Sequence, residues 1–265
     1  MKPDYLKFYE KPSVRGIWRF LWDYLSESSK LRKLSLANRQ KDYLRLMSHS
    51  DKLSLHHEMN RSLLEGRSGW DGYDYGEGYF YQSCKLAGIT GFRDTEGRIR
   101  EMRLRSYVEQ KRVLEIGCNS GFLAVALCEN AKEIVGMDVN PYLIAIGNAL
   151  VEHFDLKNLQ FSTQGFEEYN ADEPFDVVLS FANHSTYDGK TKHTLDEFFG
   201  KCHRLLCKGG RLMFESHPPE LEPPDVLGKT LEIIQKYFHF EKQAILQYGS
   251  FLDRDRTFVI AKKRE

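Results

Sequence analysis

The segment Val113-Leu-Glu-Ile-Gly-Cys-Asn-Ser-Gly121 decides the fold of this 265-residue chain. An apolar run ends in a turn that carries Gly117 and Gly121, and the apolar stretch Phe122-Leu-Ala-Val-Ala-Leu127 follows at once. Glycine lets the backbone approach a ligand closely because it has no Cβ, and the start of a helix offers free N–H groups. The segment therefore predicts a strand, a ligand-binding turn and a helix in direct succession.

On the C-terminal side of this turn, short apolar runs alternate with helical patterns to the end of the chain. Strands that alternate with helices predict a Rossmann-like, doubly wound α/β fold, whose mostly parallel sheet binds its ligand at the carboxyl ends of the strands. The last two strand-like runs are joined by a short polar loop, which predicts an antiparallel edge strand. The predicted strands are 112–116, 133–138, 159–163, 175–180, 210–216, 241–247 and 257–262, and the predicted helices are 122–130, 141–154, 195–206 and 226–238.

The chain divides into two predicted parts, a helical N-terminal extension with an aromatic lid over residues 1–108 and the ligand-binding domain over residues 109–265. Apolar residues recur near helical spacing from about Leu31 to Leu64, which predicts one long helical stretch. The segment 66–78 and the residues just after it are rich in glycine and tyrosine. This composition is too aromatic for a flexible tether, so an ordered lid is expected.

Charge and cysteine content restrict the class of protein. Lysine and arginine together number 38, as do aspartate and glutamate, so no overall positive field draws the chain to polyanions. The five cysteines include no Cys-x-x-Cys pair, so neither a zinc site nor a disulfide framework is expected. The first ten residues carry charges where a signal peptide needs an apolar run, and no stretch has the ~18 consecutive apolar residues of a membrane span. A cytoplasmic location without a transmembrane segment is expected.

Two acids stand near the glycine turn. Glu115 lies within the predicted strand, where a buried carboxylate is costly without a partner, so it organises the turn or faces the ammonium of a methionine moiety. Asp138 ends the next strand, where an acid can accept both hydroxyls of a ribose; a solvated loop aspartate is the alternative. A dinucleotide site would need Gly-x-Gly-x-x-Gly, whereas Gly117 and Gly121 enclose three residues. The pattern favours an adenosyl cofactor that carries methionine.

From about residue 110 to the end, the chain resembles the class I S-adenosylmethionine-dependent methyltransferases. Glu115, Gly117 and Gly121 match the family's first motif, and Asn119 stands where a middle glycine is usual, in a loop where asparagine tolerates left-handed backbone. The resemblance implies S-adenosyl-L-methionine as cofactor and Asp138 as the ribose acid. The family's adenine-binding acid is replaced by Gly165, so the Gln164 backbone or the Phe166 ring is the expected substitute. The residues expected to contact the cofactor are Tyr81, Arg93, Glu115, Gly117, Cys118, Asn119, Gly121, Phe122, Asp138, Val139, Gln164, Gly165, Phe166, Ser180 and Phe181.

Methyl transfer from a sulfonium needs alignment of donor and acceptor, and a base if the acceptor is a hydroxyl or an ammonium. His184 and Tyr187 follow the fourth strand of the predicted sheet, and His217 follows the fifth, so these three are the candidate catalytic residues. The alternative for His184 is a structural histidine hydrogen-bonded in a loop. The histidines and acids lack the compact spacing of metal ligands, so no metal is expected.

The stretch before the domain resembles the pre-domain region of methyltransferases that act on bacterial surface-glycan precursors or specialised metabolites, and its layout is similar to that of enzymes that modify the tRNA wobble uridine. Either resemblance implies that Tyr81, Gln82, Arg93 and Arg98 face the cofactor or an anionic substrate; a packed aromatic cap is the alternative.

The leading functional prediction is methyl transfer to oxygen or nitrogen of a small metabolite or glycan precursor. The alternatives are a tRNA wobble-uridine methyltransferase and a non-catalytic cofactor-binding partner subunit. Three roles are open for the basic, aromatic segment 17–25: a peripheral membrane contact, a contact with RNA phosphates, and a packed core or homodimer interface.

Overall fold

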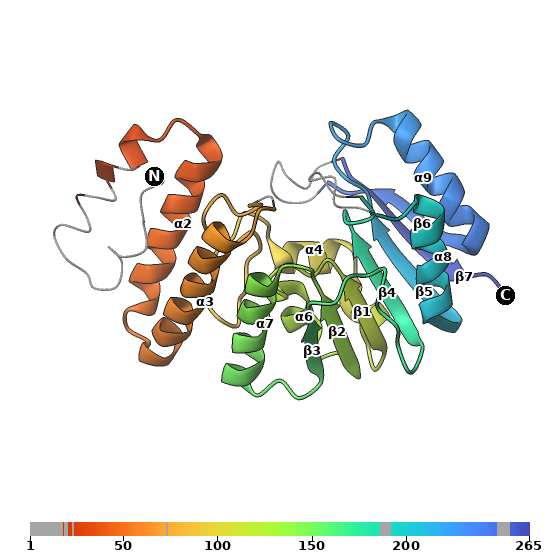
Figure 1. Ribbon diagram of the computed structural model, residues 1–265, viewed down its shortest axis with the longest axis horizontal. Helices are drawn as coiled ribbons and strands as arrows, with labels where there is room; N and C mark the ends of the chain where they lie inside the picture. The colour runs from red at the N-terminus through yellow and green to blue at the C-terminus, as the bar shows by residue number, and fades with distance from the viewer. Residues whose placement is uncertain (1–17, 19–20, 23, 73, 186–191, 248–254) are drawn as a thin grey trace.

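A seven-stranded sheet in the order β3-β2-β1-β4-β5-β7-β6 forms the centre of the protein (Figure 1). The structure is a computed structural model, and it describes residues 18, 21–22, 24–72, 74–185, 192–247 and 255–265. Strand β7 runs antiparallel to β5 and β6, and the other neighbouring strands are parallel, so the predicted Rossmann-like fold is confirmed. The strands are β1 Arg112–Ile116, β2 Glu133–Met137, β3 Leu159–Ser162, β4 Phe175–Phe181, β5 Leu206–Glu215, β6 Phe238–Ile245 and β7 Thr257–Lys263.

Strand β1 lies in the middle of the parallel part, between β2 and β4. Leu114 pairs with Val135 on one side and with Val178 on the other, and four of the five β1 residues are buried. This explains the nearly continuous apolar run, because a strand covered on both faces has no solvent side. The chain order of the strands reverses between β1 and β4, which creates the crevice where open α/β sheets bind ligands. The turn 117–121 therefore opens into that crevice.

Helices cover both faces of the sheet. Within the domain these helices are α6 Phe122–Leu127, α7 Pro141–Phe154, α8 Leu195–Leu205 and α9 Pro224–Tyr237. The start of α7 is fixed by Asn140, whose side chain accepts hydrogen bonds from the backbone N–H groups of Tyr142 and Leu143. A capping box between Thr194 and Glu197 fixes the start of α8.

Several element boundaries differ from the sequence predictions, most of all at the end of α6 and the starts of β5 and β6. Helix α6 ends at Leu127 instead of residue 130, because the Leu127 carbonyl accepts from both Asn130 and Ala131 as the chain turns toward β2. Strand β5 begins at Leu206 instead of residue 210, and Leu206 pairs with Phe175 ahead of an irregularity in the β4–β5 register. Helix propensity and glycine content depend on the local sequence, so they do not predict pairing between residues of distant strands.

The N-terminal part contributes α2 Lys30–Leu46, α3 Ser50–Gly69, α4 Thr95–Glu101 and α5 Leu104–Val108. The prediction of one long helical stretch was wrong at residues 47–49, where the His49 N–H donates to the Leu46 carbonyl and the chain reverses. The reversal places α3 beside α7, as Figure 1 shows. Earlier in the chain, Trp18, Trp22 and Leu25 are about 70% exposed, so these side chains do not pack in the core of the molecule.

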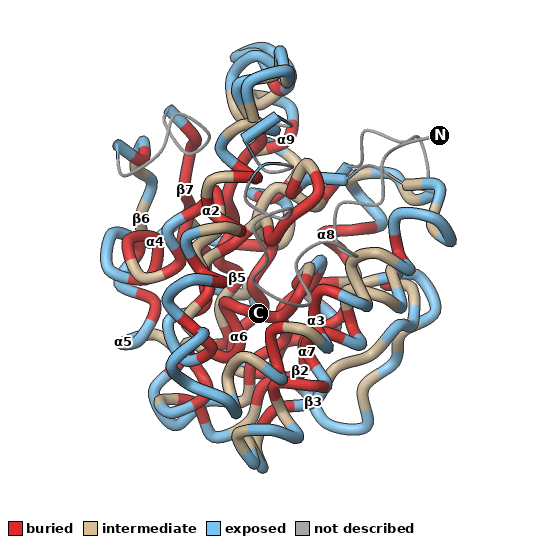
Figure 2. The backbone as a smooth tube through the Cα atoms, turned by 90° about the vertical axis from the view of Figure 1, so that its left-hand side faces the viewer, coloured by how far each residue is buried: buried red, intermediate tan, exposed pale blue. Residues whose placement is uncertain are grey.

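The extension and the domain share one hydrophobic core. The cluster on one face of the sheet joins Leu55 and Met59 of α3 to strand and helix residues of the domain. Phe80 reaches the domain directly, with its ring centroid 5.4 Å from that of Phe122. Figure 2 shows the strands within the buried interior. In the described part of the chain, no helix has the length and apolar character needed to span a membrane.

Candidate active site

The turn after β1 alternates left-handed and ordinary backbone. Gly117, Asn119 and Gly121 have φ values of +63°, +54° and +72°. Asn119 adopts this conformation because its side-chain Oδ1 accepts the backbone N–H of Ser120 at 2.8 Å, a local bond that asparagine makes readily. Asparagine thus adopts a left-handed conformation at the position where the motif that the sequence resembles has a glycine.

The two glycines are required by packing within the protein. A Cβ on Gly117 would lie 2.9 Å from Cβ of Asn183, whose amide donates to the Ile116 carbonyl and accepts from the Ser180 hydroxyl at 2.6 Å. A Cβ on Gly121 would lie 2.2 Å from the ring of Phe161. The first contact ties the loop after β4 to the turn after β1. The turn therefore presents its backbone to the crevice between these two strands.

Asp138, at the end of β2, holds the turn through its carboxylate. Oδ2 accepts the Asn119 N–H at 3.0 Å, and Oδ1 accepts the Asn140 N–H at 3.0 Å. Burial raises the pKa of Asp138 to about 6, although these two hydrogen bonds act in the opposite direction. A carboxylate has about four acceptor positions, so each oxygen can accept one more donor. The neighbouring Val139 side chain is 53% exposed and offers an apolar surface beside this carboxylate.

Glu115 is buried on β1, directly before the turn. The backbone N–H of Ala124 in α6 donates to its carboxyl group, which satisfies a donor that the first turn of a helix leaves free. Among the described residues, Oε2 of Glu115 has no hydrogen-bond partner. Burial raises the pKa of Glu115 to about 8, and the charge of Arg98 opposes this shift. An unpaired buried acceptor of this kind requires a donor or a cation.

The three predicted adenine contacts, Gln164, Gly165 and Phe166, lie in the loop after β3 in three different environments. Gln164 is exposed, and its side-chain amide donates to the Glu168 carbonyl at 3.0 Å. Gly165 is half-buried, and a Cβ there would meet the Glu168 carboxylate. The Phe166 ring is buried, with its centroid 4.9 Å from that of Phe198 in the core. The ring of Phe166 is therefore directed into the core.

Three other predicted cofactor residues, Cys118, Phe122 and Ser180, are fully buried. Phe122 packs on Phe80, and the Ser180 hydroxyl is bonded to Asn183. The side chains of Cys118 and Phe122 are therefore not exposed to a ligand.

The predicted anion-binding arginines converge on a buried carboxylate at the end of β5. Arg93 and Arg98 place Nη2 atoms 2.8 Å and 2.7 Å from the two carboxylate oxygens of Glu215, and Arg256 approaches to 3.2 Å. Burial raises the pKa of Glu215, but the three guanidinium groups outweigh this and hold it well below its usual range. The Arg93 guanidinium also lies over the Tyr81 ring, 5.6 Å from its centroid. The sequence analysis identified Arg93 and Arg98 but neither Arg256 nor the carboxylate that the three share.

The Arg98 guanidinium also lies over the ring of Phe181, 5.3 Å from its centroid, at the end of β4. Phe181 is half-buried, and its side chain connects the arginine cluster to the loop after β4.

A second buried cluster follows β4 and β5. Nε2 of His184 lies 3.1 Å from Oε1 of Glu222, the same oxygen that accepts the Thr230 hydroxyl at 2.9 Å. Oε2 of Glu222 accepts the His217 backbone N–H at 2.9 Å. Within the described residues, Nδ1 of His184 has no hydrogen-bond partner. Sequence reasoning missed Glu222, which no motif distinguishes from the exposed Glu220 in the same loop.

His217 lies beside this pair, with its ring centroid 4.8 Å from that of His184 and its Nε2 3.1 Å from the Ser185 hydroxyl. Burial and the neighbouring His184 lower the pKa of His217 to about 4, so its ring is neutral at physiological pH. The third predicted catalytic residue, Tyr187, lies outside the described residues. In the described ranges, no group of three or more histidine, cysteine or acidic side chains is arranged to hold a metal ion.

A family model described as a methyltransferase domain matches residues 108–250, which is more than half of the chain. The chain belongs to the methyltransferase domain family. The matched residues of this methyltransferase include the turn, Asp138 and both histidines, and they begin four residues before β1.

Known relatives of this methyltransferase carry related names. A protein named as a methyltransferase of Geobacillus sp. is 29% identical over 122 residues, 44% of this chain and 47% of that protein. Malonyl-[acyl-carrier protein] O-methyltransferase 1 of Ilyobacter polytropus is 24% identical over 164 residues, 58% of each chain. The chain therefore spans about half the length of these relatives.

Among solved structures, the N-methyltransferase NodS of Bradyrhizobium japonicum WM9 in complex with S-adenosyl-L-homocysteine covers 78% of this chain and 100% of its own, with 18% identity and a TM-score of 0.53. A methyltransferase of Listeria monocytogenes described as S-adenosylmethionine-dependent covers 65% of this chain and 100% of its own, with 14% identity and a TM-score of 0.53. The shared feature is the fold of the class I S-adenosylmethionine-dependent methyltransferases.

The cofactor of this family is S-adenosylmethionine, and the residues of this methyltransferase fit it. Oε2 of Glu115 is a buried acceptor that a donor or cation would satisfy, which suits the ammonium of a methionine moiety. Asp138 retains acceptor positions for two hydroxyls, beside the exposed Val139 side chain. All three lie at the carboxyl ends of β1 and β2, where this fold binds ligands.

Proposed function

We propose that this methyltransferase transfers a methyl group from S-adenosylmethionine to an oxygen or nitrogen of a small metabolite or glycan precursor. The observation that carries the proposal is a pair of carboxyl groups beside the turn. Glu115 has an unpaired buried oxygen, and Asp138 bonds to the turn at Asn119 with one oxygen and to Asn140 with the other. When bound, the cofactor supplies an electrophilic methyl group on a sulfonium. The protein must hold the donor, align the acceptor and remove a proton.

For the donor, we assign the ammonium of the methionine moiety to Glu115 and the ribose hydroxyls to Asp138. The backbone of the turn, including Cys118 and Asn119, lines the methionine end. Val139 replaces Phe166 as the apolar contact for the adenine, because the Phe166 ring packs on Phe198 in the core. These assignments place the donor across the carboxyl ends of β1 and β2.

For proton removal, we assign His184, with Glu222 as the residue that positions it. A histidine satisfied inside a core uses both ring nitrogens, whereas His184 uses only Nε2 among the described residues. If the Nε2 proton is held by the Glu222 carboxylate, Nδ1 carries the lone pair that a general base needs. The neighbouring His217 ring, whose pKa is lowered to about 4, carries no charge at pH 7.

Calorimetric titration of the full chain with S-adenosylhomocysteine tests the donor site. Burial leaves the Glu115 carboxyl, whose pKa is about 8, mostly protonated at pH 7. A bound ammonium would lower that pKa, so binding should release up to one proton. Titrations in buffers of different ionisation enthalpy measure this release directly.

The matched control for this titration is Glu133→Gln, a change at the opposite end of the sheet, where Glu133 pairs with Arg112. Glu115→Gln should bind without proton release, and Glu133→Gln should behave like the unchanged protein. Absence of binding by the unchanged protein would refute the proposed function. Salt-dependent binding of tRNA, with no turnover of small acceptors, would favour an RNA substrate instead.

A further inference from the structure

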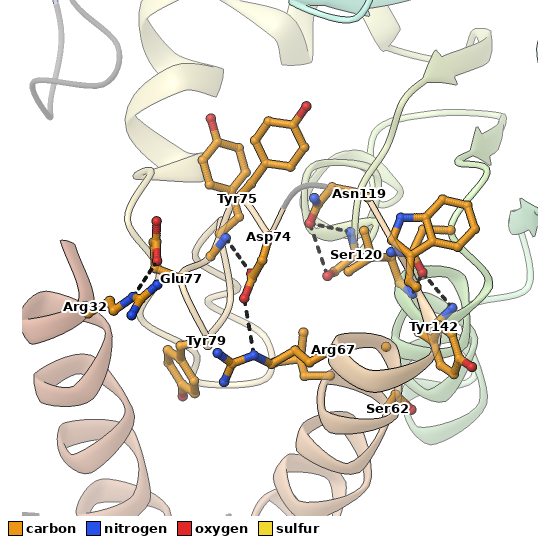
Figure 3. Close-up of a pocket in the computed structure, with 18 residues that line it drawn as sticks. Arg32, Ser62, Arg67, Asp74, Tyr75, Glu77, Tyr79, Asn119, Ser120 and Tyr142 are labelled. Carbon is orange, nitrogen blue, oxygen red and sulfur yellow. Dashed lines mark hydrogen bonds and ion pairs between the residues drawn. The ribbon is translucent and has the colours of Figure 1, made fainter. Parts of the chain in front are cut away.

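A cavity of about 380 Å³ lies between the N-terminal extension and the cofactor turn (Figure 3). One wall comes from the C-terminal half of α3 and from residues 70–72 and 74–81. The opposite wall comes from Asn119 and Ser120 of the turn and from Asn140 and Tyr142 at the start of α7. A ligand in this cavity would therefore touch the same turn to which we assign the donor.

The charged side chains of the cavity pair with each other. Nε of Arg67 lies 3.4 Å from Asp74, and Nε of Arg32 lies 3.0 Å from Glu77. Two cations face two anions, so the lining has no net charge from these four residues. An ionised phosphate or carboxylate would gain little here, because each cation already has a partner of opposite charge. Alternating N–H donors and carboxylate acceptors instead suit hydroxyl groups, which donate and accept at once.

Aromatic side chains supply part of the remaining surface. Trp70, Tyr75, Tyr81 and Tyr142 line the cavity, and the Tyr75 and Tyr81 rings have centroids 5.6 Å apart. Flat aromatic faces bind the apolar face of a ring at a low cost in conformational entropy. The combination of flat apolar faces with paired donors and acceptors matches a ring that is apolar on its faces and hydroxylated at its edge.

The cavity wall is held in place before any ligand binds. Tyr142 lies against α3, where a Cβ on Gly66 or Gly69 would come within 3.0 Å or 2.2 Å of its side chain. Tyr79 is fixed by a buried network in which its hydroxyl donates to Asp42 at 2.8 Å and lies 2.9 Å from Nε2 of His56. A preformed wall lowers the ordering cost of binding.

We propose that this cavity binds one part of the methyl acceptor and that this part is a neutral, polyhydroxylated ring, such as a glycosyl group. The base assigned above, His184, does not line the cavity, so the reacting atom belongs to another part of the acceptor. This inference rests on the proposed function, since it names the substrate class of the same site. It assigns Trp70 as a stacking surface and Asp74 and Glu77 as hydroxyl acceptors.

The chain's three tryptophans allow a direct test. Trp18 and Trp22 are exposed and lie outside the cavity, so Trp18→Phe with Trp22→Phe leaves Trp70 as the sole indole reporter. This protein is saturated with S-adenosylhomocysteine and titrated with methyl glucoside, methyl galactoside, methyl mannoside and N-acetylglucosamine. Glucose 6-phosphate and uridine serve as the charged and the nucleoside competitors. The readout is the emission of Trp70.

At least one neutral sugar should change the Trp70 emission saturably, at a concentration about tenfold or more below that needed for glucose 6-phosphate or uridine. Asp74→Asn with Glu77→Gln, which removes the carboxylates that pair with Arg67 and Arg32, should reverse the preference toward glucose 6-phosphate. Trp70→Phe in the otherwise unchanged chain should give no sugar-dependent emission change, as the control. The proposal is overturned if none of the four neutral sugars changes the Trp70 emission, or if the reporter protein binds glucose 6-phosphate or uridine more tightly than the sugars. Calorimetry with S-adenosylhomocysteine separates this failure from failure of the proposed function.

Discussion

Nη2 of Arg98 lies 2.7 Å from Oε2 of Glu215, and both side chains are almost completely buried. The pair connects α4 of the N-terminal part to the end of β5, and Arg93 and Arg256 bond to the other oxygen of the same carboxylate. A buried carboxylate shared by three guanidinium groups stabilises the fold only while every member is present, because each charge left without its partner would be strongly destabilising.

Glu215→Gln should lower the free energy of unfolding by about 3–5 kcal/mol, the usual cost of breaking a buried ion pair. Chemical denaturation measures this loss. The matched control is Glu241→Gln on β6, which breaks the exposed ion pair with Arg211 and should cost about 0–1 kcal/mol. Because the pKa of Glu215 is depressed by folding, its stabilisation is complete above the usual value of 4.5 and is lost as the pH falls below it. Equal losses for the two variants would contradict the cluster's role.

Asp138→Ala should weaken S-adenosylhomocysteine binding by roughly tenfold to a hundredfold, since hydrogen bonds to a charged group contribute about 1.5–3 kcal/mol. Ribose hydroxyls donate to the ionised carboxylate, whose pKa in the free protein is about 6. Measured in the Glu115→Gln background, which removes the proton release at Glu115, affinity should be constant above pH 6 and fall as the pH drops below it. The exposed Asp172→Ala is the control and should change neither quantity. Calorimetry that gives the same affinity for Asp138→Ala and the unchanged protein removes Asp138 from the ribose role.

The ring of Phe161 lies between Gly121, Gly136 and Gly147. Alanine variants of Gly121 and Gly147 distinguish steric clash from backbone strain, because of these two only Gly121 has a positive φ. A Cβ on Gly147, inside α7, would lie 2.8 Å from the ring, and one on Gly121 would lie 2.2 Å from it at a φ of +72°. Both alanine variants should lower the free energy of unfolding by about 1–3 kcal/mol through overpacking. Phe161→Leu should rescue Gly147→Ala but not Gly121→Ala, whose left-handed backbone stays unfavourable.

Gly228→Ala is the control for this series, because nothing lies within 4 Å of a Cβ at that position in α9. Alanine there should raise the free energy of unfolding by about 0.5–1 kcal/mol through helix propensity alone. Thermal and chemical denaturation of the full set distinguish the three cases. If Phe161→Leu rescued both clashing variants equally, strain at Gly121 would have no part in the effect.

The parts of the site that the sequence predicted are those set by neighbouring residues. The turn from Gly117 to Gly121 follows from the strand before it and the helix after it, and Asn119 adopts its left-handed conformation through a bond to the next residue. Apolar periodicity likewise predicted the sheet and its parallel order, because each strand must be covered on both faces.

The parts that were missed join residues far apart in the chain. Arg93 and Glu215 are 122 positions apart, and His184 and Glu222 are 38 apart. No local pattern assigns such partners, since the choice depends on which loops the sheet brings together. The reversal at His49 was missed for a related reason: the segment 47–49 contains neither glycine nor proline, and only the packing of α3 beside α7 requires a turn there.

The pair formed by His184 and Glu222 gives the last prediction. His184→Gln should lower kcat by about a hundredfold to ten-thousandfold, the usual contribution of a general base, and leave S-adenosylhomocysteine affinity unchanged. Glu222→Gln should lower kcat by a smaller factor, because an amide still positions the ring but stabilises its protonated form less well. The rate is measured as S-adenosylhomocysteine formation by the full chain with a metabolite extract as the source of acceptor. His153→Gln, in the exposed last turn of α7, is the matched control.

A structural histidine would behave differently in the same experiment. Because His184 packs against the rings of Phe199 and Phe214, its loss as a core residue would lower the unfolding temperature and the rate together. A catalytic base would lower the rate of protein that remains fully folded at the assay temperature. Thermal denaturation is therefore recorded for each variant. If His184→Gln is folded and its rate is undiminished, the His184 ring has a packing role only, and another group removes the proton.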